Sequence, residues 1–153
     1  MKVALGTDHA GFPLKERIAD AIREAGHEVV DCGAEQLIPA DDYPDYAQRV
    51  ALAIRDGRAE RGVLVCGSGV GAAVAANKFV GIRASLCHDT FSAHQGVEDD
   101  SMNILCLGAR VVGPSLAEEL VRTFLRARFS GAERHVRRLG KIAAFEEGLG
   151  IRD

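Results

Sequence analysis

Short apolar runs alternate with longer amphipathic stretches along this chain. The runs are rich in valine, isoleucine and leucine and have the length of buried strands, whereas the stretches between them repeat apolar residues at helical spacing. Strands that alternate with helices form βαβ units with right-handed crossovers. The pattern therefore predicts an α/β fold with a five-stranded parallel sheet flanked by helices, its strands lying at 3–6, 27–31, 62–66, 83–87 and 103–107.

Proline and glycine mark the ends of the predicted helices. Pro13 opens one amphipathic stretch and Gly26 closes it, while Pro44 and Gly57 delimit the next. A long loop at 33–43 is acidic and contains proline, which is typical of an exposed connection at the rim of a site. The predicted helices are 13–25, 44–55, 72–78, 115–127 and 133–147.

Length and composition fit one domain. The 153 residues, 47% of them hydrophobic, can bury one sizeable core, so we expect a single domain over 1–153. The formal charge of -3 disfavours a nucleic-acid surface, because binding to phosphate backbones calls for a basic field. No apolar leader follows Met1, and no run approaches the roughly 18 apolar residues of a membrane span. We therefore expect a cytoplasmic protein without a membrane partner.

The four cysteines are widely spaced and form no CxxC pair, which disfavours a zinc ribbon or a thioredoxin-type redox site. Cys32, Cys87 and Cys106 lie in or at the ends of strand-like runs, where a thiol packs as a small hydrophobic side chain. Cys66 differs because the turn Gly67-Ser68-Gly69-Val70-Gly71 and a predicted helix follow it directly. Amides at a helix N-terminus favour negative charge and stabilise a thiolate, so Cys66 is a candidate base or nucleophile.

Other interpretations of this glycine-rich turn are weaker. The spacing satisfies a loose GxGxxA dinucleotide pattern, with Asp89 near the expected distance for a ribose-binding acid, but the turn does not follow the first strand. A Walker loop would need GxxxxGK[ST]. A cysteine phosphatase would need an arginine at position 72, which is alanine. A turn that only lets strand and helix pack is the remaining alternative.

Polar side chains follow all five predicted strands, at 8–9, 31–32, 66–68, 87–89 and 108–110. Ligands of open parallel sheets bind at the carboxyl ends of the strands, so these segments predict a polar small-molecule site. His9 and Arg110 could bind an anion there, or remain solvated. Arg134, Arg138 and Lys141 share one helical face, which fits either a solvated surface or a phosphate clamp.

These segments together resemble the sugar-phosphate isomerases of the type B ribose-5-phosphate isomerase and LacA/LacB galactose-6-phosphate isomerase group. The resemblance implies a Rossmann-like sheet in a homodimer or tetramer. It also implies interconversion of aldose and ketose phosphates, of the ribose 5-phosphate/ribulose 5-phosphate type, without metal or organic cofactor. The matching segments cover nearly the whole chain: 6–11, 42–44, 66–71, 75–78, 81–84, 108–111 and 134–138.

The resemblance also implies roles for individual residues. Cys66 would move a proton between C1 and C2 of the open-chain sugar, with Ser68 and the amides of the turn stabilising the enediolate. Preorganised donors of this kind commonly supply the largest catalytic effect. The helix from about 133 would pack on a partner subunit. The implied substrate-binding residues are Asp8, His9, Tyr43, Gly67, Gly69, Val70, Gly71, Asn77, Asp100 and Arg110, with Arg134 and Arg138 contributed by the partner.

Position 99 departs from the family pattern. The family carries a histidine there, associated with opening of the furanose ring, whereas this chain carries Asp99. Burial or the neighbouring acids Glu98 and Asp100 could raise the pKa of Asp99 enough to make it an acid. Alternatively, His94 or His88 could substitute. A third explanation is a substrate that needs no ring opening, such as a tetrose 4-phosphate, whose 4-oxygen is esterified.

Three functional hypotheses follow from the sequence. The first is cofactor-independent aldose–ketose isomerisation with Cys66 as acid and base, acting on ribose 5-phosphate or on another phosphosugar such as a tetrose 4-phosphate or a hexose 6-phosphate. The second is a non-catalytic phosphosugar-binding protein, motivated by the loss of the ring-opening histidine. The third is a dinucleotide-binding enzyme.

Overall fold

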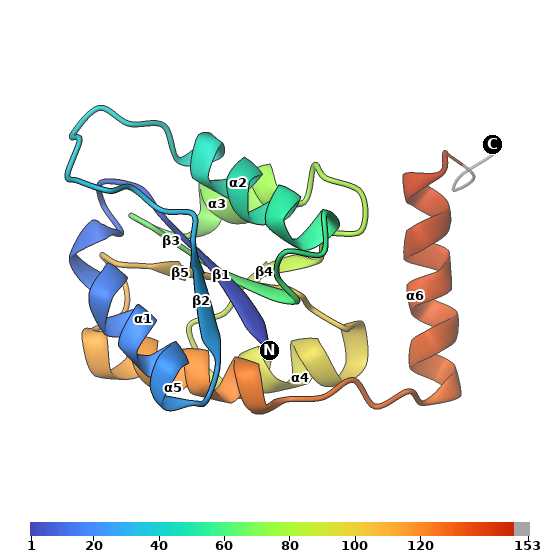
Figure 1. Cartoon of the computed structure of the whole chain (residues 1–153). Coiled ribbons are helices and arrows are strands. Elements are labelled where there is room, and N and C mark those ends of the chain that lie inside the picture. Colours follow the sequence, from blue (N-terminus) through green and yellow to red (C-terminus); the bar gives the residue numbers. More distant parts are fainter. Residues whose placement is uncertain (149–153) are drawn as a thin grey trace.

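The computed structural model describes residues 1–148 and places a parallel sheet at the centre of the molecule (Figure 1). The five strands are β1 (Lys2–Thr7), β2 (Glu28–Asp31), β3 (Arg61–Cys66), β4 (Ala84–Leu86) and β5 (Ile104–Gly108). They pair in the order β2-β1-β3-β5-β4, and every neighbouring pair is parallel. The predicted α/β class, with five parallel strands, is confirmed; residues 149–153 of the expected domain lie outside the described part.

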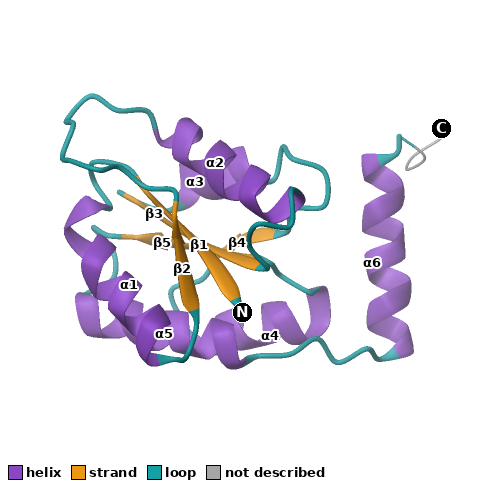
Figure 2. Ribbon diagram, viewed as in Figure 1, coloured by secondary structure: helices purple, strands orange, loops and turns teal. Residues whose placement is uncertain are grey.

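Helices cover both faces of the sheet (Figure 2). One face carries α1, α4 and α5, and the other carries α2 and α3. The sixth helix, α6, follows an extended segment and stands beside the sheet. The helices are α1 (Lys15–Glu24), α2 (Tyr43–Arg55), α3 (Val70–Ala76), α4 (Thr90–Asp100), α5 (Pro114–Arg126) and α6 (Glu133–Glu146), with a 3-10 turn, η1 (Phe12–Leu14), before α1.

The strand order explains why helices lie on both faces. From β1 the chain moves to one side through α1 to β2, and then crosses by way of α2 to β3 on the other side of β1. Because crossovers between parallel strands are right-handed, a reversal of direction along the sheet requires a change of face. The chains leaving β1 and β3 therefore separate to opposite faces, which opens a crevice between the ends of these two strands.

Alternation along the strands divides the core into two clusters. On one face, Val3 and Leu5 of β1 pack with alternate residues of β3 and β5 against α1 and α5. On the other face, Ala4 of β1 packs with the intervening residues of β3 and β5 against α2. Cys66 belongs to the second cluster. The thiol consequently points toward the side of the sheet covered by α2 and α3.

The helix α4 is absent from the sequence prediction. Its buried residues Ala93 and Val97 are few, so its apolar stripe is weak. The start of the helix is nevertheless encoded, because the Asp89 side chain accepts a hydrogen bond from the Ser92 backbone N–H at 2.7 Å. A further difference is at Pro13, which lies in η1 rather than at the start of α1.

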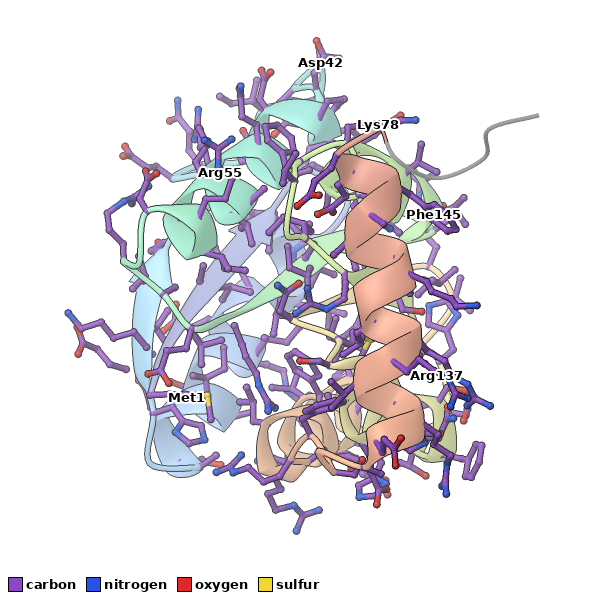
Figure 3. The ribbon with its side chains drawn as sticks, turned by 90° about the vertical axis from the view of Figure 1, so that its right-hand side faces the viewer. Met1, Asp42, Arg55, Lys78, Arg137 and Phe145 are labelled. Atoms are coloured by element: carbon purple, nitrogen blue, oxygen red, sulfur yellow. The ribbon has the colours of Figure 1, made fainter. Side chains whose placement is uncertain are left out.

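Figure 3 shows α6 lying along one side of the molecule, with Arg137 and Phe145 on its surface. Its large apolar side chains Val136, Ile142 and Phe145 are exposed, and His135 is its one buried residue among those described. No described helix has both the length and the apolar character needed to cross a membrane.

Candidate active site

The crevice between β1 and β3 contains a cavity of about 320 Å³ at the carboxyl end of the sheet. Its walls come from the segments that follow β1, β3 and β5 and from the start of α2. Ten residues line it: Asp8, His9, Ala10, Tyr43, Cys66, Gly67, Ser68, Gly71, Arg110 and Val111. The structure therefore brings together most of the site residues expected from the sequence.

Cys66 ends β3, and its thiol is buried at the floor of this crevice. The Gly69 backbone N–H donates a hydrogen bond to Cys66 Sγ, with a nitrogen–sulfur distance of 3.1 Å. Gly69 has a left-handed backbone with φ of 81°, and a Cβ there would collide with the Leu86 side chain and the Leu107 backbone. Glycine at this position is thus required for the amide to reach the thiol.

The other cysteines are structural. All four cysteines are free thiols, and Cys32, Cys87 and Cys106 pack in the two core clusters. Burial raises the pKa of each of these three thiols above its ordinary value. A raised pKa disfavours the thiolate, so none of the three is a good nucleophile.

The turn after Cys66 is shaped by close contacts. A Cβ on Gly71 would lie 2.6 Å from Tyr43 Cζ, so the Tyr43 ring rests directly against the first turn of α3. A Cβ on Gly108 would lie 2.5 Å from the Ser68 backbone oxygen. Ser68 is exposed, and its Oγ accepts a hydrogen bond from the Val70 N–H at 3.3 Å. The turn is consequently fixed on two sides while Ser68 remains open to a ligand.

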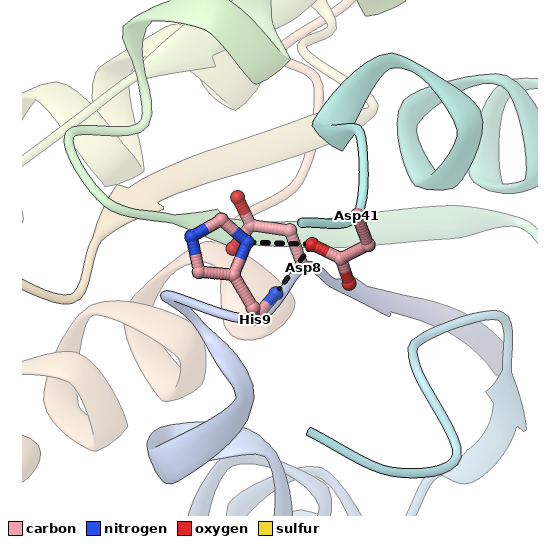
Figure 4. A group of neighbouring side chains, drawn as sticks. All are labelled: Asp8, His9 and Asp41. Atoms are coloured by element: carbon pink, nitrogen blue, oxygen red, sulfur yellow. Dashed lines mark hydrogen bonds and ion pairs between the residues drawn. The ribbon is translucent and has the colours of Figure 1, made fainter. Parts of the chain in front are cut away.

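Asp8 and His9 follow β1 and line the cavity, and Figure 4 shows them beside Asp41. Asp8 is buried, and its Oδ1 accepts from the Gly11 N–H at 2.8 Å. His9 is held by Asp41, whose Oδ1 lies 2.6 Å from His9 Nδ1 and 3.0 Å from the His9 backbone nitrogen. Because Nδ1 is engaged, Nε2 is the ring nitrogen available to a ligand.

Asp41 contacts a candidate site residue, and the sequence did not predict it. It lies in the acidic loop expected at the rim, and the Tyr46 hydroxyl donates to its other oxygen at 2.8 Å. Burial opposes ionisation of Asp41, but the hydrogen bonds from His9 and Tyr46 outweigh it and lower the pKa of the carboxyl. The ionised carboxylate therefore anchors His9 to the loop.

Replacement of Asp41 by asparagine is expected to lower stability by about 2 kcal/mol at pH 7, since hydrogen bonds to a charged group are lost. A lowered pKa in the folded state stabilises the protein above the ordinary carboxyl pKa of about 4 and loses that effect as pH falls through the lowered value. The difference between wild type and Asp41→Asn should therefore shrink below pH 4. Urea unfolding followed by circular dichroism checks this, with Asp42→Asn as the exposed control. A difference that stays constant from pH 7 to pH 3 would contradict it.

Arg110 closes the third side of the cavity. Its backbone N–H donates to the Gly67 carbonyl oxygen at 3.0 Å, which ties the end of β5 to the end of β3. A Cβ on Gly67 would lie 3.6 Å from both Cζ and Nε of Arg110, so the guanidinium lies over Gly67. Arg110 and His9 thus put two potential donors to an anion beside the glycine-rich turn.

Five of the expected site residues lie away from this cavity. Asn77 and Asp100 line a larger cavity of about 570 Å³ beside β4 and α6. The side-chain amide of Asn77 is bonded to Ala84, donating to its carbonyl oxygen at 2.8 Å and accepting from its N–H at 2.9 Å. The remaining three are Asp99 on α4 and Arg134 and Arg138 on α6.

Topology separates Asp99 from the Cys66 of its own chain. The end of α4 precedes β5, so Asp99 lies at the amino edge of the sheet, whereas Gly108 at the other end of β5 pairs with Cys66. The strand between them spans about 13 Å. Within one chain, Asp99 therefore cannot reach a ligand at the crevice between β1 and β3.

Asp8, His9 and Asp41 are the described residues that could hold a metal ion, since one ligand atom from each lies within 4.8 Å of the others. Occupation by a metal would compete with the hydrogen bond between His9 Nδ1 and Asp41 Oδ1. The arrangement instead suits an anion, because His9 and Arg110 flank a turn of backbone amides.

The fold and the crevice define a parallel α/β protein with a thiol and an anion-binding turn at the topological switch point of its sheet. The chain matches the model of the Ribose/Galactose Isomerase family over residues 3–142, and it belongs to that family. It is 44% identical to ribose-5-phosphate isomerase B of Escherichia coli, over 95% of this chain and 97% of that protein.

Two further relatives bear on substrate and fold. The chain is 41% identical to D-erythrulose-4-phosphate isomerase of Pectobacterium atrosepticum, over 86% of each protein. The solved type B ribose 5-phosphate isomerase of Trypanosoma cruzi matches with a TM-score of 0.94 at 44% identity, over 97% of this chain and 99% of that chain. The chain is accordingly a sugar-phosphate isomerase.

Proposed function

We propose that the protein interconverts an aldose phosphate and a ketose phosphate through a cis-enediolate, with Cys66 as the acid and base. The position of Cys66 carries this proposal, because its thiol accepts the Gly69 amide at the floor of a polar cavity. The thiolate would take the proton from C2 of the aldose and the thiol would deliver it to C1 of the enediolate, while the hydroxyl proton passes from O2 to O1, so one group serves both carbon steps. No redox cofactor is needed, because the two electrons stay within the sugar.

The backbone amides of residues 67–71 would stabilise the oxygen on which negative charge develops. Ser68 would add its hydroxyl, which is exposed toward the cavity. Asp8 and Tyr43 would hold sugar hydroxyls from the two walls. Donors that are fixed before the reaction need no reorganisation when the charge appears, which makes them effective.

His9 and Arg110 would bind the phosphate, together with Arg134 and Arg138 of a second copy of the chain. A homodimer is supported by the exposed apolar side chains of α6 and by the adjoining groove beside β4. It would also bring Asp99, Asp100 and Asn77 to a shared site, which one chain does not assemble. Each copy of the chain, a single domain over 1–153, would then contribute residues to both active sites of the dimer.

The surroundings of the candidate ring-opening groups favour an open-chain substrate. Asp99 accepts a hydrogen bond from Gln95 Nε2 at 2.6 Å. His88 Nε2 accepts from the Gly108 backbone N–H at 3.1 Å, and His94 lies on the surface beside Glu98. Since each of these groups already has a partner within its own chain, a tetrose 4-phosphate, which cannot close a furanose ring, is the candidate substrate that they favour.

A comparison of substrates tests this choice. We expect kcat/KM for erythrose 4-phosphate to exceed that for ribose 5-phosphate by about 100-fold, which is the contribution of a missing general acid. Asp99→His should raise turnover of ribose 5-phosphate while leaving tetrose turnover unimproved. Coupled steady-state assays measure both, with allose 6-phosphate as a hexose control. Efficient turnover of ribose 5-phosphate by the unaltered chain would exclude the open-chain preference.

A further inference from the structure

His135 is a buried imidazole on an otherwise exposed helix. It lies in the first turn of α6 and is 2% exposed, whereas Arg134 and Val136 on either side of it are exposed. The helix packs against α4 at this end. Burial of a polar ring is costly unless its nitrogens are bonded, so the partners of His135 define its role.

The hydrogen bonds of His135 specify one tautomer. Arg134 Nε donates to His135 Nε2 at 2.9 Å, and a guanidinium has no acceptor, so Nε2 must be unprotonated. The ring proton therefore lies on Nδ1, which is 2.7 Å from Ser130 Oγ and 3.4 Å from Asp99 Oδ1. The ring thus directs its donor toward Ser130 and Asp99 and its acceptor toward Arg134.

The bond to Arg134 is unusual because successive residues on a helix do not face each other. It turns the Arg134 side chain around the helix toward His135 and occupies only Nε. The two terminal NH2 groups stay available, and these are the groups with which a guanidinium holds a phosphate bidentately. Within residues 1–148, Arg134 makes no other side-chain hydrogen bond.

We infer that His135 is a positioning residue, which aims the guanidinium of Arg134 at the substrate phosphate while Ser130 and Asp99 hold the imidazole in the required tautomer. The inference rests on the proposed function, in which Arg134 binds the phosphate in the site of a second copy. It gives Asp99 a role other than ring opening, because its carboxylate on α4 then holds the His135 ring of α6 in place.

Two replacements of His135 separate positioning from packing. Glutamine offers a carbonyl oxygen near the place of Nε2 and can accept from Arg134, whereas leucine fills the space without an acceptor. His135→Leu is expected to raise KM for the phosphosugar and Kd for inorganic phosphate by about tenfold, with kcat within about twofold of wild type. His135→Gln should restore most of both. Steady-state kinetics and calorimetric titration with phosphate measure them.

A double-mutant cycle links the effect to Arg134. In an Arg134→Met background, His135→Leu should cause no further rise in Kd or KM, because the group that it positions is already gone. Arg137→Met removes one charge from the same helix and serves as the matched control, expected to leave both constants near wild type. An additive loss in the cycle would show that His135 acts independently of Arg134 and would overturn the inference.

The result stays interpretable if His135→Leu folds poorly. Ser130→Ala removes the acceptor of the Nδ1 proton from an exposed residue and should raise Kd for phosphate by about threefold. Failure of the proposed isomerase activity would appear as absent turnover in the unaltered protein. The phosphate titrations would then still decide the role of His135, and unchanged Kd in folded His135→Leu would reject it.

Discussion

Cys66→Ala is expected to lower kcat by about 10³-fold, the effect of removing a positioned acid and base. The thiol is the titratable group that ends β3 at the crevice, and the Gly69 amide is directed at its sulfur. Alanine removes the proton carrier while leaving the walls of the cavity in place. Exchange of the C2 proton with deuterated solvent, followed by NMR, should therefore stop while phosphosugar binding remains measurable by calorimetry.

Cys32→Ala provides the matched control for this prediction. Cys32 is a free thiol in the same core cluster, is buried to a similar degree and follows β2, two strands from β3 in the sheet. Its removal should leave C2 exchange at the wild-type rate. Exchange that persists in Cys66→Ala would remove Cys66 from the proposed role and assign the proton transfer to another group.

Gly69→Ala is expected to cost about 3 kcal/mol of stability and to lower kcat by about 100-fold. A left-handed backbone with a Cβ costs roughly 1–2 kcal/mol, and the contacts with Leu86 and the Leu107 backbone add a penalty of overpacking, typically 1–3 kcal/mol. Relief of that contact would move the amide away from Cys66 Sγ. One lost donor of this kind commonly reduces kcat by two to three orders of magnitude.

Gly26→Ala separates backbone strain from the contacts at the site. Gly26 has the same φ of 81°, and nothing lies within 4 Å of a Cβ placed there. Its replacement should cost only the strain, about 1 kcal/mol, and should not affect turnover. Urea unfolding and steady-state kinetics on both variants test the difference. If Gly69→Ala and Gly26→Ala lose equal stability and both keep the wild-type kcat, the collision at Gly69 is relieved without moving the amide.

Local sequence signals are sufficient to predict most of the fold. The buried strands are continuous apolar runs because both faces of the sheet are covered, and proline and glycine mark the helix ends near Pro44 and Gly57. The helix α4 escapes prediction because its apolar stripe is weak and its N-cap signal is a single aspartate. Edge strand β4 is also shorter than expected, since only Ala84–Leu86 pair with β5.

Site residues at the ends of strands can be predicted from the sequence. Contacts between loops or helices that are distant in the sequence cannot. Cys66 ends a strand and Asp8 and Arg110 lie just after strands, and the convergence of parallel strands at one edge is a property of the fold class. Asp41 comes from a loop, so its hydrogen bond with His9 depends on the course of the loop backbone, which the composition of the loop does not specify. The contact between Asp99 and His135 likewise depends on how the extended segment before α6 runs.

The pairing of β1 with β3 has a consequence for the order of folding. Thr7 pairs with Val65, so the two walls of the crevice meet only after a segment of nearly sixty residues has closed. Contacts between such distant residues form late, because the loop-closure entropy is lost before the pairing compensates for it. A chain in which only β1, α1 and β2 had formed would present Asp8 and His9 without the Cys66 thiol. The chain should therefore become able to bind its ligand in the same folding step that pairs β1 with β3.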